Sequence, residues 1–401
     1  MTHNLKRWLA PAAAVTAAAA LAACSSSGSS SNSSSTPATT SPSSSTPASS
    51  TSASATAAPG VAAAQAAVAQ FEATTTTYPV PTAPISGVSA LKGKTVYYIP
   101  LVAAIPGFVV TAATMKTALA AAGLRLQVCD AQGQPSGLAS CIQQATTAGA
   151  AGIVTDAVPY AMAENAFNAA KAKGIPIIIT DQLPPSANTA NTDQVTYVPG
   201  VVNQPSQIFD WVVASSAGKA NLVIAEEADS PSSIAYVTNG LSILKSCTGC
   251  TYSIKTITAT TNSQLSSDTA ANLLANPNAD YYYTEFEDSL DPTVQGIQQA
   301  NRTSVQLSVA GGSTDGLGRL ASGSGPVKAV VAVDQAFAGW ALTDEILRMA
   351  TKSAPVIETF PSRLFTSENI GTIQVNAANQ ASGAWFGNDS YQAAFKQLWG
   401  V

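Results

Sequence analysis

Acidic side chains follow several apolar runs of this sequence, and their carboxylates are the groups best able to do chemistry. Asp156 follows AGIVT, Asp181 follows IPIIIT, and the run 285–288 (EFED) follows DYYYT. Carboxylates accept strong hydrogen bonds from hydroxyl groups, work in pairs in glycosidases, and coordinate cations. The run 285–288 could bind a ligand, which could be a cationic one, hold a metal, or be the solvated acidic start of a helix.

The residue inventory excludes other chemistry. The one histidine is His3, in a segment with the pattern of an export signal, so the mature chain would lack an imidazole. Imidazole-based hydrolases are excluded, and most zinc sites use histidine. A net charge of −5, without a Lys/Arg cluster, argues against nucleic-acid binding. GGSTDGLG lacks the spacing and lysine of a phosphate loop. We therefore predict no cofactor and no metal.

The head of the chain predicts export. Residues 1–23 have a basic start, a short apolar stretch and a small-residue end, which is typical of a signal peptide. The end, LAAC, is similar to the lipobox of bacterial lipoproteins, in which Cys24 would be lipidated; the alternative is an ordinary signal peptide with an incidental cysteine. Residues 24–91 are predicted to be a disordered, low-complexity tether, with a short helix possible at 61–72.

From residue 92 onward, apolar runs alternate with segments of helical period. Continuous apolar runs such as TVYYIP and IPIIIT are typical of parallel strands that are buried on both faces. Strands are predicted at 95–100, 124–129, 151–155, 175–180, 195–200, 221–226, 251–260, 280–285, 304–311 and 327–333. This pattern predicts an α/β fold of two Rossmann-like, doubly wound lobes.

An irregular stretch at 181–194 divides the two lobes. We place the N-terminal lobe at 92–192 with about 335–357, and the C-terminal lobe at 193–334 with about 358–401. Ligands of such sheets bind beyond the carboxyl ends of the strands. The sequence therefore predicts a hinge and a site between the lobes.

The exported chain with two lobes resembles a known family over about residues 92–401. The stretches YYIPLVAAIPGF, LQVCDAQGQPSGLASCIQQATTAGAAGIVTD, KAKGIPIIITDQ and NPNADYYYTEFEDSLDPTVQGIQQA carry the resemblance by their order and spacing. They are similar to type I, ribose-binding-like periplasmic binding proteins, and in particular to actinobacterial lipoproteins that bind substrate for sugar ABC transporters. CTGC, VAGGSTDGL and FKQLWGV are also similar to the actinobacterial sugar-binding members.

The resemblance and the strand ends together predict the ligand site. The resemblance implies an aromatic at Phe108, an acid at Asp181, the pair at 286–287, and polar groups at 334–335. The alternatives are a core position for Phe108 and helix caps for Asp156 and Ser232. The predicted ligand-binding residues are Phe108, Asp156, Tyr160, Asp181, Gln182, Ser232, Phe286, Glu287, Asp288, Asp334 and Gln335.

Four cysteines follow Cys24. An even number in an exported chain predicts two structural disulfides, from Cys129, Cys141, Cys247 and Cys250. A bridge between the first two would join a strand to the next helix. The CTGC pair could instead be a redox pair, but it comes after a helix and before a strand, which is the reverse of the usual redox arrangement.

These features predict a solute-binding lipoprotein of an ABC importer rather than an enzyme. Two lobes would close by a hinge over a small polar ligand, most simply a carbohydrate or a related hydroxylated solute. The predicted partners are that ligand, an ABC permease with its ATPase, and the outer face of the cell membrane through a lipid anchor. The alternatives are a glycan hydrolase that uses Glu285, Glu287 or Asp181, and a surface sensor for a signalling partner.

Overall fold

The computed structural model describes residues 59–186 and 191–401, which contain two separate β-sheets. The first sheet has the order β2-β1-β3-β4-β5, and all of its pairings are parallel. Its strands are β1 (Thr95–Pro100), β2 (Arg125–Val128), β3 (Gly152–Asp156), β4 (Ile177–Thr180) and β5 (Val195–Val198).

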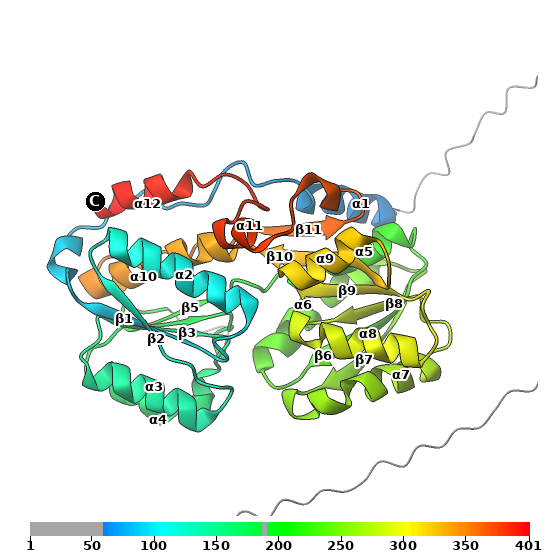
Figure 1. Cartoon of the computed structure of the whole chain (residues 1–401), viewed down its shortest axis with the longest axis horizontal. Helices are drawn as coiled ribbons and strands as arrows, with labels where there is room; N and C mark the ends of the chain where they lie inside the picture. Colours follow the sequence, from blue (N-terminus) through cyan, green and yellow to red (C-terminus); the bar gives the residue numbers. More distant parts are fainter. Residues whose placement is uncertain (1–58, 187–190) are drawn as a thin grey trace, which may run out of the picture. The chain divides into compact units, whose positions relative to one another are not determined.

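Helices cover both faces of the first sheet, as its apolar strands require (Figure 1). Successive residues of β4 point to opposite faces: Ile178 packs with α2, α10 and α12, while Ile177 and Ile179 pack with α3 and α4. The helices of this lobe are α2 (Pro106–Ala121), α3 (Pro135–Thr147), η2 (Tyr160–Ala163), α4 (Glu164–Ala172), α10 (Gln335–Thr351) and α12 (Tyr391–Trp399).

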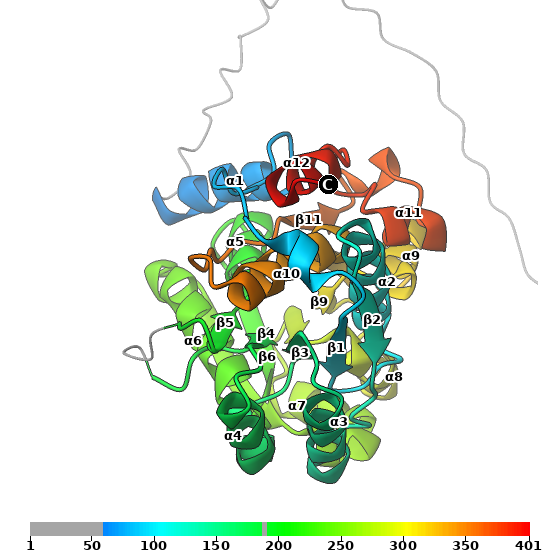
Figure 2. The same cartoon turned by 90° about the vertical axis from the view of Figure 1, so that its left-hand side faces the viewer.

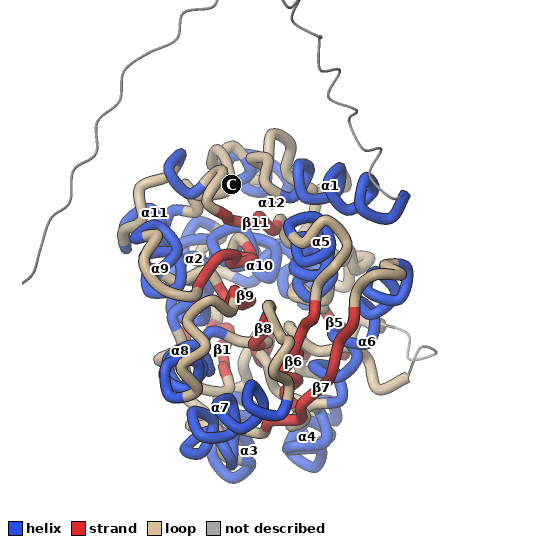
Figure 3. Tube along the Cα trace, turned by 90° about the vertical axis from the view of Figure 1, so that its right-hand side faces the viewer, coloured by secondary structure: helices blue, strands red, loops and turns tan. Residues whose placement is uncertain are grey.

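The second sheet has the order β11-β10-β9-β8-β6-β7, and Figure 3 shows its strands β6 and β7 side by side. Only β11 runs antiparallel to its neighbour. Its strands are β6 (Asn221–Glu227), β7 (Thr251–Ile257), β8 (Tyr281–Thr284), β9 (Gln306–Gly311), β10 (Val327–Val333) and β11 (Ser362–Thr366).

The second sheet is also covered on both faces, so each lobe is a three-layer sandwich. One face packs against α1, α5 and α6, and the other against α7, α8 and α9. The helices of this lobe are α1 (Pro59–Phe71), α5 (Gln204–Ser215), α6 (Pro231–Ser246), α7 (Leu265–Ala275), α8 (Leu290–Gln299), α9 (Thr314–Ser322) and α11 (Ala377–Ser382). Its short 3-10 turns are η3 (Ala259–Gln264), η4 (Glu287–Ser289) and η5 (Ile370–Thr372), whereas η1 (Val88–Leu91) packs on the first lobe.

The predicted α/β fold with two lobes is confirmed, and each predicted strand has a counterpart. The boundaries between the lobes differ from the prediction, because 195–198 pairs with β4 and so belongs to the first lobe. The C-terminal helix α12 also returns to the first lobe, where Trp399 stacks on Trp340 with ring centroids 5.6 Å apart. Strand β11 was not predicted.

The prediction of a disordered tether through residue 91 is wrong from residue 59 onward. Helix α1 packs on α5, where Val61 is buried in the core of the second lobe, and this matches the expected short helix. Residues 72–91, here called the strap, then run to the first lobe and bury Val88 and Leu91 there (Figure 2). Apolar burial at both ends explains why this stretch is ordered.

Hydrogen bonds hold the strap along its length. Near its start, the Arg363 Nε donates to the carbonyl of Glu72 at 2.9 Å. In the middle, the Tyr78 hydroxyl donates to Asp334 Oδ2 at 3.1 Å. Towards its end, the amide of Ile85 donates to the carbonyl of Leu398 at 2.8 Å. The strap therefore connects both lobes and the turn between β10 and α10.

Both predicted disulfides are present. Cys129–Cys141 joins the end of β2 to α3, and Cys247–Cys250 closes the turn between α6 and β7. Among the residues described, no helix combines the length and apolar character needed to cross a membrane. The predicted signal peptide and Cys24 lie outside the described residues.

Candidate functional site

The carboxyl ends of the first sheet's central strands bring three polar side chains together. Asp156 ends β3, and its Oδ2 accepts a hydrogen bond from the Tyr98 hydroxyl of β1 at 2.5 Å. Asp181 follows β4, which pairs with β3, and lies against Asp156. Asp181 has a positive φ of 56°, a strained conformation for a non-glycine residue that is most often retained at functional sites.

Burial controls the charge of these two acids. It raises the pKa of Asp156 to about 6, against which the hydrogen bond from Tyr98 acts. It raises the pKa of Asp181 well above its usual range, and the neighbouring charge of Asp156 adds to the effect. Two adjacent buried carboxyls do not both ionise readily. At neutral pH, Asp181 is therefore the acid that retains a proton, and it can donate that proton to Asp156.

The second lobe supplies Glu285 and Tyr236. Glu285 follows β8, and its Oε2 accepts the amide of Glu227, which ends β6, at 2.9 Å. Burial, with the nearby charges of Glu227 and Glu226, raises the pKa of Glu285 to about 9. The phenol pKa of Tyr236 on α6 is raised by burial and by the charges of Asp181, Glu285 and Asp156. Tyr236 thus lies near acids from both lobes.

Several side-chain atoms of this region are buried without a hydrogen-bond partner, although buried polar atoms are normally paired. They are Asp156 Oδ1, Asp181 Oδ1, Tyr236 OH, Tyr283 OH, Thr284 Oγ1 and Glu285 Oε1. A proton shared by the two aspartates would pair two of these atoms. The rest are available to the polar groups of a bound molecule.

Direct hydrogen bonds join the lobes beside these acids. The Oε1 of Gln182, just after β4, accepts from the hydroxyls of Ser230 and Ser232, each at 3.0 Å. The amide of Leu183 donates to Ser232 Oγ at 2.9 Å. The cap of α6 is Ser230, which accepts the amide of Ser232 at 3.1 Å. Ser232 therefore connects the lobes, and the capping alternative applies to Ser230.

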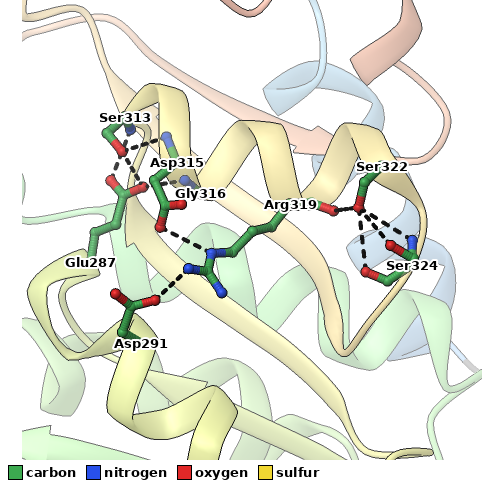
Figure 4. A network of polar contacts seen from close by, with 8 residues as sticks. All are labelled: Glu287, Asp291, Ser313, Asp315, Gly316, Arg319, Ser322 and Ser324. Atoms are coloured by element: carbon green, nitrogen blue, oxygen red, sulfur yellow. Dashed lines mark hydrogen bonds and ion pairs between the residues drawn. The ribbon is translucent and has the colours of Figure 1, made fainter.

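Glu287 is engaged within the protein, and the ligand contact that the resemblance implied for it stays a prediction. Its Oε2 accepts the amide of Ser313 at 2.8 Å, and its Oε1 accepts the Ser313 hydroxyl at 2.7 Å and the amide of Gly316 at 2.8 Å (Figure 4). Arg319 of α9, the helix that contains Gly316, pairs with Asp315 and Asp291. Both carboxylate oxygens of Glu287 are thus engaged at the N-terminus of α9, where a negative charge is favourable.

Asp334 and Gln335, at the start of α10, are also engaged within the protein. Asp334 caps α10 by accepting the amide of Phe337 at 3.0 Å, and it accepts the Tyr78 hydroxyl of the strap. Burial raises its pKa to about 7. Gln335 Oε1 accepts the Thr111 hydroxyl of α2 at 2.7 Å. These contacts explain both residues structurally, and their ligand contacts stay predictions.

The other predicted residues are distributed around the acids. Phe108 is buried in the core of the first lobe, as its structural alternative states. Tyr160 stacks on Phe167, and its hydroxyl donates to Asn168 Oδ1 at 2.7 Å, so its polar end is used by α4. Phe286 is half-buried and Asp288 is exposed. Asp156 is not a helix cap, because the residue at the N-cap of α4 is Ala163.

Sequence reasoning missed Tyr98 and Tyr236. It named Glu285 in the run 285–288 and in the hydrolase alternative, but not among the predicted ligand-binding residues. Glu285 directly follows a strand, so its position was a usable signal. Tyr98 is in mid-strand and Tyr236 is in mid-helix, where a tyrosine reads as a core residue. Within residues 59–186 and 191–401, no group of three or more His, Cys, Asp or Glu side chains is arranged to hold a metal.

Comparison with solved structures supports the same architecture. A 5-methylthioribose transporter solute-binding protein from Thermotoga lettingae is 14% identical over 79% of this chain and 99% of its own, with a TM-score of 0.64. A sugar ABC transporter protein from Yersinia enterocolitica is 17% identical over 79% and 98%, also at 0.64. The myo-inositol binding protein of Caulobacter is 20% identical over 73% and 98%, at 0.59. At these identities the likeness establishes the fold.

Sequence comparison establishes the family. No curated protein matches the chain significantly. The family model described as a periplasmic binding protein domain matches residues 96–353, more than half of the chain. This match begins in β1 and ends just after α10, so it includes Asp156, Asp181, Tyr236 and Glu285. The chain belongs to the periplasmic binding protein family.

Proposed function

We propose that this protein is the extracytoplasmic solute-binding component of an ABC importer and that it captures a sugar, a polyol or a related hydroxylated solute. The observation that carries the proposal is the set of buried, unpaired polar atoms at the strand ends of both lobes and on α6. Asp156 and Asp181 come from the first lobe, and Tyr236 and Glu285 come from the second. A ligand with several hydroxyl groups both donates and accepts hydrogen bonds, which suits carboxyl and phenol groups.

Proteins of the same fold support this ligand class. Solved examples hold allitol, in a protein from Agrobacterium vitis, 5-methylthioribose and myo-inositol. Each is a small molecule with several hydroxyl groups. Because a ligand that contacts both lobes favours the closed arrangement, binding and closure would be linked. A permease with its ATPase would then recognise the closed form.

The location of the protein is part of the proposal. Residues 1–23 would direct export, Cys24 would carry the lipid, and the low-complexity stretch up to residue 58 would join the lipid to α1. Two or more acyl chains hold a protein stably at a membrane. Mass spectrometry of the protein purified from membranes tests this part, since lipidation at Cys24 predicts loss of residues 1–23 and an added diacylglyceryl mass.

A thermal-shift screen with confirmation by isothermal titration calorimetry tests the proposed function. We expect a sugar or a polyol to raise the melting temperature, because a ligand that binds only the native state stabilises it. The Asp181→Asn variant should lose binding, and Asp291→Asn, in the exposed ion pair of α8, should retain it. The absence of any shift with sugars and polyols, together with measurable glycoside hydrolysis, would contradict the proposal.

A further inference from the structure

The candidate site contains an excess of buried acids. Asp156 and Glu285 are each 1% exposed, and Asp181 is 9% exposed. Among residues 59–186 and 191–401, no ion pair joins a Lys or Arg to any of the three. Buried carboxylates are normally paired with a cation or bonded to several donors. The acid-rich site therefore lacks the partner that such groups usually have.

For acids outside the candidate site, this chain supplies a cation or several hydrogen-bond donors. The buried Asp344 on α10 pairs with the buried Arg348 one turn later, with Oδ2 and Nε 2.6 Å apart, and it accepts the indole N–H of Trp399 at 2.6 Å. Glu287 is bound by three donors at the start of α9. Glu345 and Glu358 are also buried with one unpaired oxygen each, but the charge of Arg348 acts to lower the pKa of both, which burial raises. Among the described residues, no Lys or Arg acts in this way on the three site acids, and this marks them as different.

Each of the three site acids has one oxygen without a hydrogen-bond partner: Asp156 Oδ1, Asp181 Oδ1 and Glu285 Oε1. Tyr236 is 2% exposed, and its hydroxyl is also unpaired. Gln182, next to Asp181, bonds Ser232 one turn before Tyr236 on α6, and the charges of all three acids act on this phenol. Unpaired carboxyl oxygens of both lobes thus lie near Tyr236.

We propose that the ligand carries an ammonium group in addition to its hydroxyl groups, as an amino sugar or an amino polyol does. This inference rests on the proposed function and makes its ligand class narrower. An ammonium group has three N–H donors and no acceptor, so it suits a site in which buried carboxyl oxygens lack a partner. The hydroxyl groups of the ligand would then bond Tyr236 and its neighbours.

Charge explains why an ammonium group is preferred to a hydroxyl group at this position. A hydroxyl group offers one donor and no charge, so it can pair with fewer carboxyl oxygens than an ammonium group can. Hydrogen bonds between ionised partners are about twice as strong as neutral ones. A positive charge among Asp156, Asp181 and Glu285 also favours their ionised forms, which burial alone disfavours. Binding of an amine should therefore release protons.

Matched ligand pairs test the inference by isothermal titration calorimetry at pH 7. The pairs are glucosamine with glucose, galactosamine with galactose, and 1-amino-1-deoxysorbitol with sorbitol, and N-acetylglucosamine is the uncharged control. We expect at least one amine to bind about tenfold or more tightly than its hydroxyl partner. Acetylation should abolish the preference. Titrations in buffers of different ionisation enthalpy should show proton release.

Two substitutions locate the ammonium group. Glu285→Gln and Asp181→Asn keep the shape of each side chain and remove its ability to ionise, and circular dichroism checks that each variant folds. Each variant should weaken binding of the amine more than binding of its neutral partner, whereas Asp291→Asn should leave the preference for the amine unchanged. If both variants keep the full preference, the amine is bound elsewhere and the inference is wrong.

The remaining outcomes separate this inference from the proposed function. If a neutral sugar or polyol binds as tightly as its amine partner, the inference is wrong and the proposed function stands. If neither member of any pair binds, nor any other sugar or polyol in the thermal-shift screen, both are wrong. If only amines bind and the two variants weaken them, both are supported.

Discussion

The cap that Glu287 forms on α9 gives the sharpest test of the structure, because the sequence suggested a different role for this residue. Glu287→Ala removes three hydrogen bonds, two from the amides of Ser313 and Gly316 and one from the Ser313 hydroxyl. Each hydrogen bond to a charged group contributes about 1.5–3 kcal/mol. Because Glu287 is half-buried, water can replace part of this, so we expect a loss of about 2–4 kcal/mol.

Urea unfolding followed by tryptophan fluorescence and by circular dichroism measures this loss. Asp291→Ala is the matched control, since its ion pair with Arg319 is near the same helix and its side chain is 66% exposed. Exposed pairs contribute about 0–1 kcal/mol, so this variant should unfold close to the wild type. Binding of the strongest ligand from the thermal-shift screen should survive in Glu287→Ala at a temperature where it is folded.

The opposite pattern would refute the reasoning. If Glu287→Ala unfolds within about 0.5 kcal/mol of the wild type, as a surface change would, the hydrogen bonds to α9 do not stabilise the protein. If it also abolishes ligand binding, Glu287 contacts the ligand, as the resemblance implied, and the capping role is wrong.

Three further expectations follow from other contacts. The folded-state pKa of Glu285, about 9, is above its ordinary value of 4.5, so the stability linked to its proton is complete below about pH 4.5 and is lost as pH rises through 9; thermal melts should show this decline, and Glu285→Gln should reduce it. Tyr78→Ala removes a core ring and the bond to Asp334, for about 3–5 kcal/mol in urea, whereas Tyr78→Phe should lose about 1 kcal/mol. In Gly316→Ala, the added Cβ would lie 2.2 Å from Glu287 Oε1. This substitution should therefore destabilise the wild type more than it destabilises the Glu287→Ala variant, and equal losses of unfolding free energy in the two backgrounds would contradict the cap.

The fold was largely predictable because both sheets are mostly parallel and buried on two faces. Runs such as IPIIIT are short and rich in β-branched residues, which favours a buried strand, and the segments between them have a helical period. The assignment of 195–198 to the second lobe failed because strand order depends on pairing between segments, which periodicity does not contain. The prediction of disorder for residues 72–91 failed for a related reason, because Tyr78 and Val88 are buried against parts of the chain that are distant in sequence.

The site was predictable where an acid directly follows a strand. Asp156 ends a strand, and Asp181 and Glu285 directly follow one; the carboxyl ends of parallel strands share one edge of a sheet. The function of Glu287 was not predictable, since it depends on the approach of α9 to a loop 26 residues earlier. The role of Tyr236 depends on which face of α6 meets the first lobe.

The hydrogen bonds of Gln182 and Leu183 to Ser230 and Ser232 have a consequence for the energetics of capture. Each contributes about 0.5–1.5 kcal/mol net, so the three together favour contact between the lobes by roughly 1.5–4.5 kcal/mol. Apparent affinity falls by the fraction of molecules that are competent to bind. With the lobes already in contact through these bonds, little of a ligand's binding energy would be needed to bring them together, and most of it would appear as affinity.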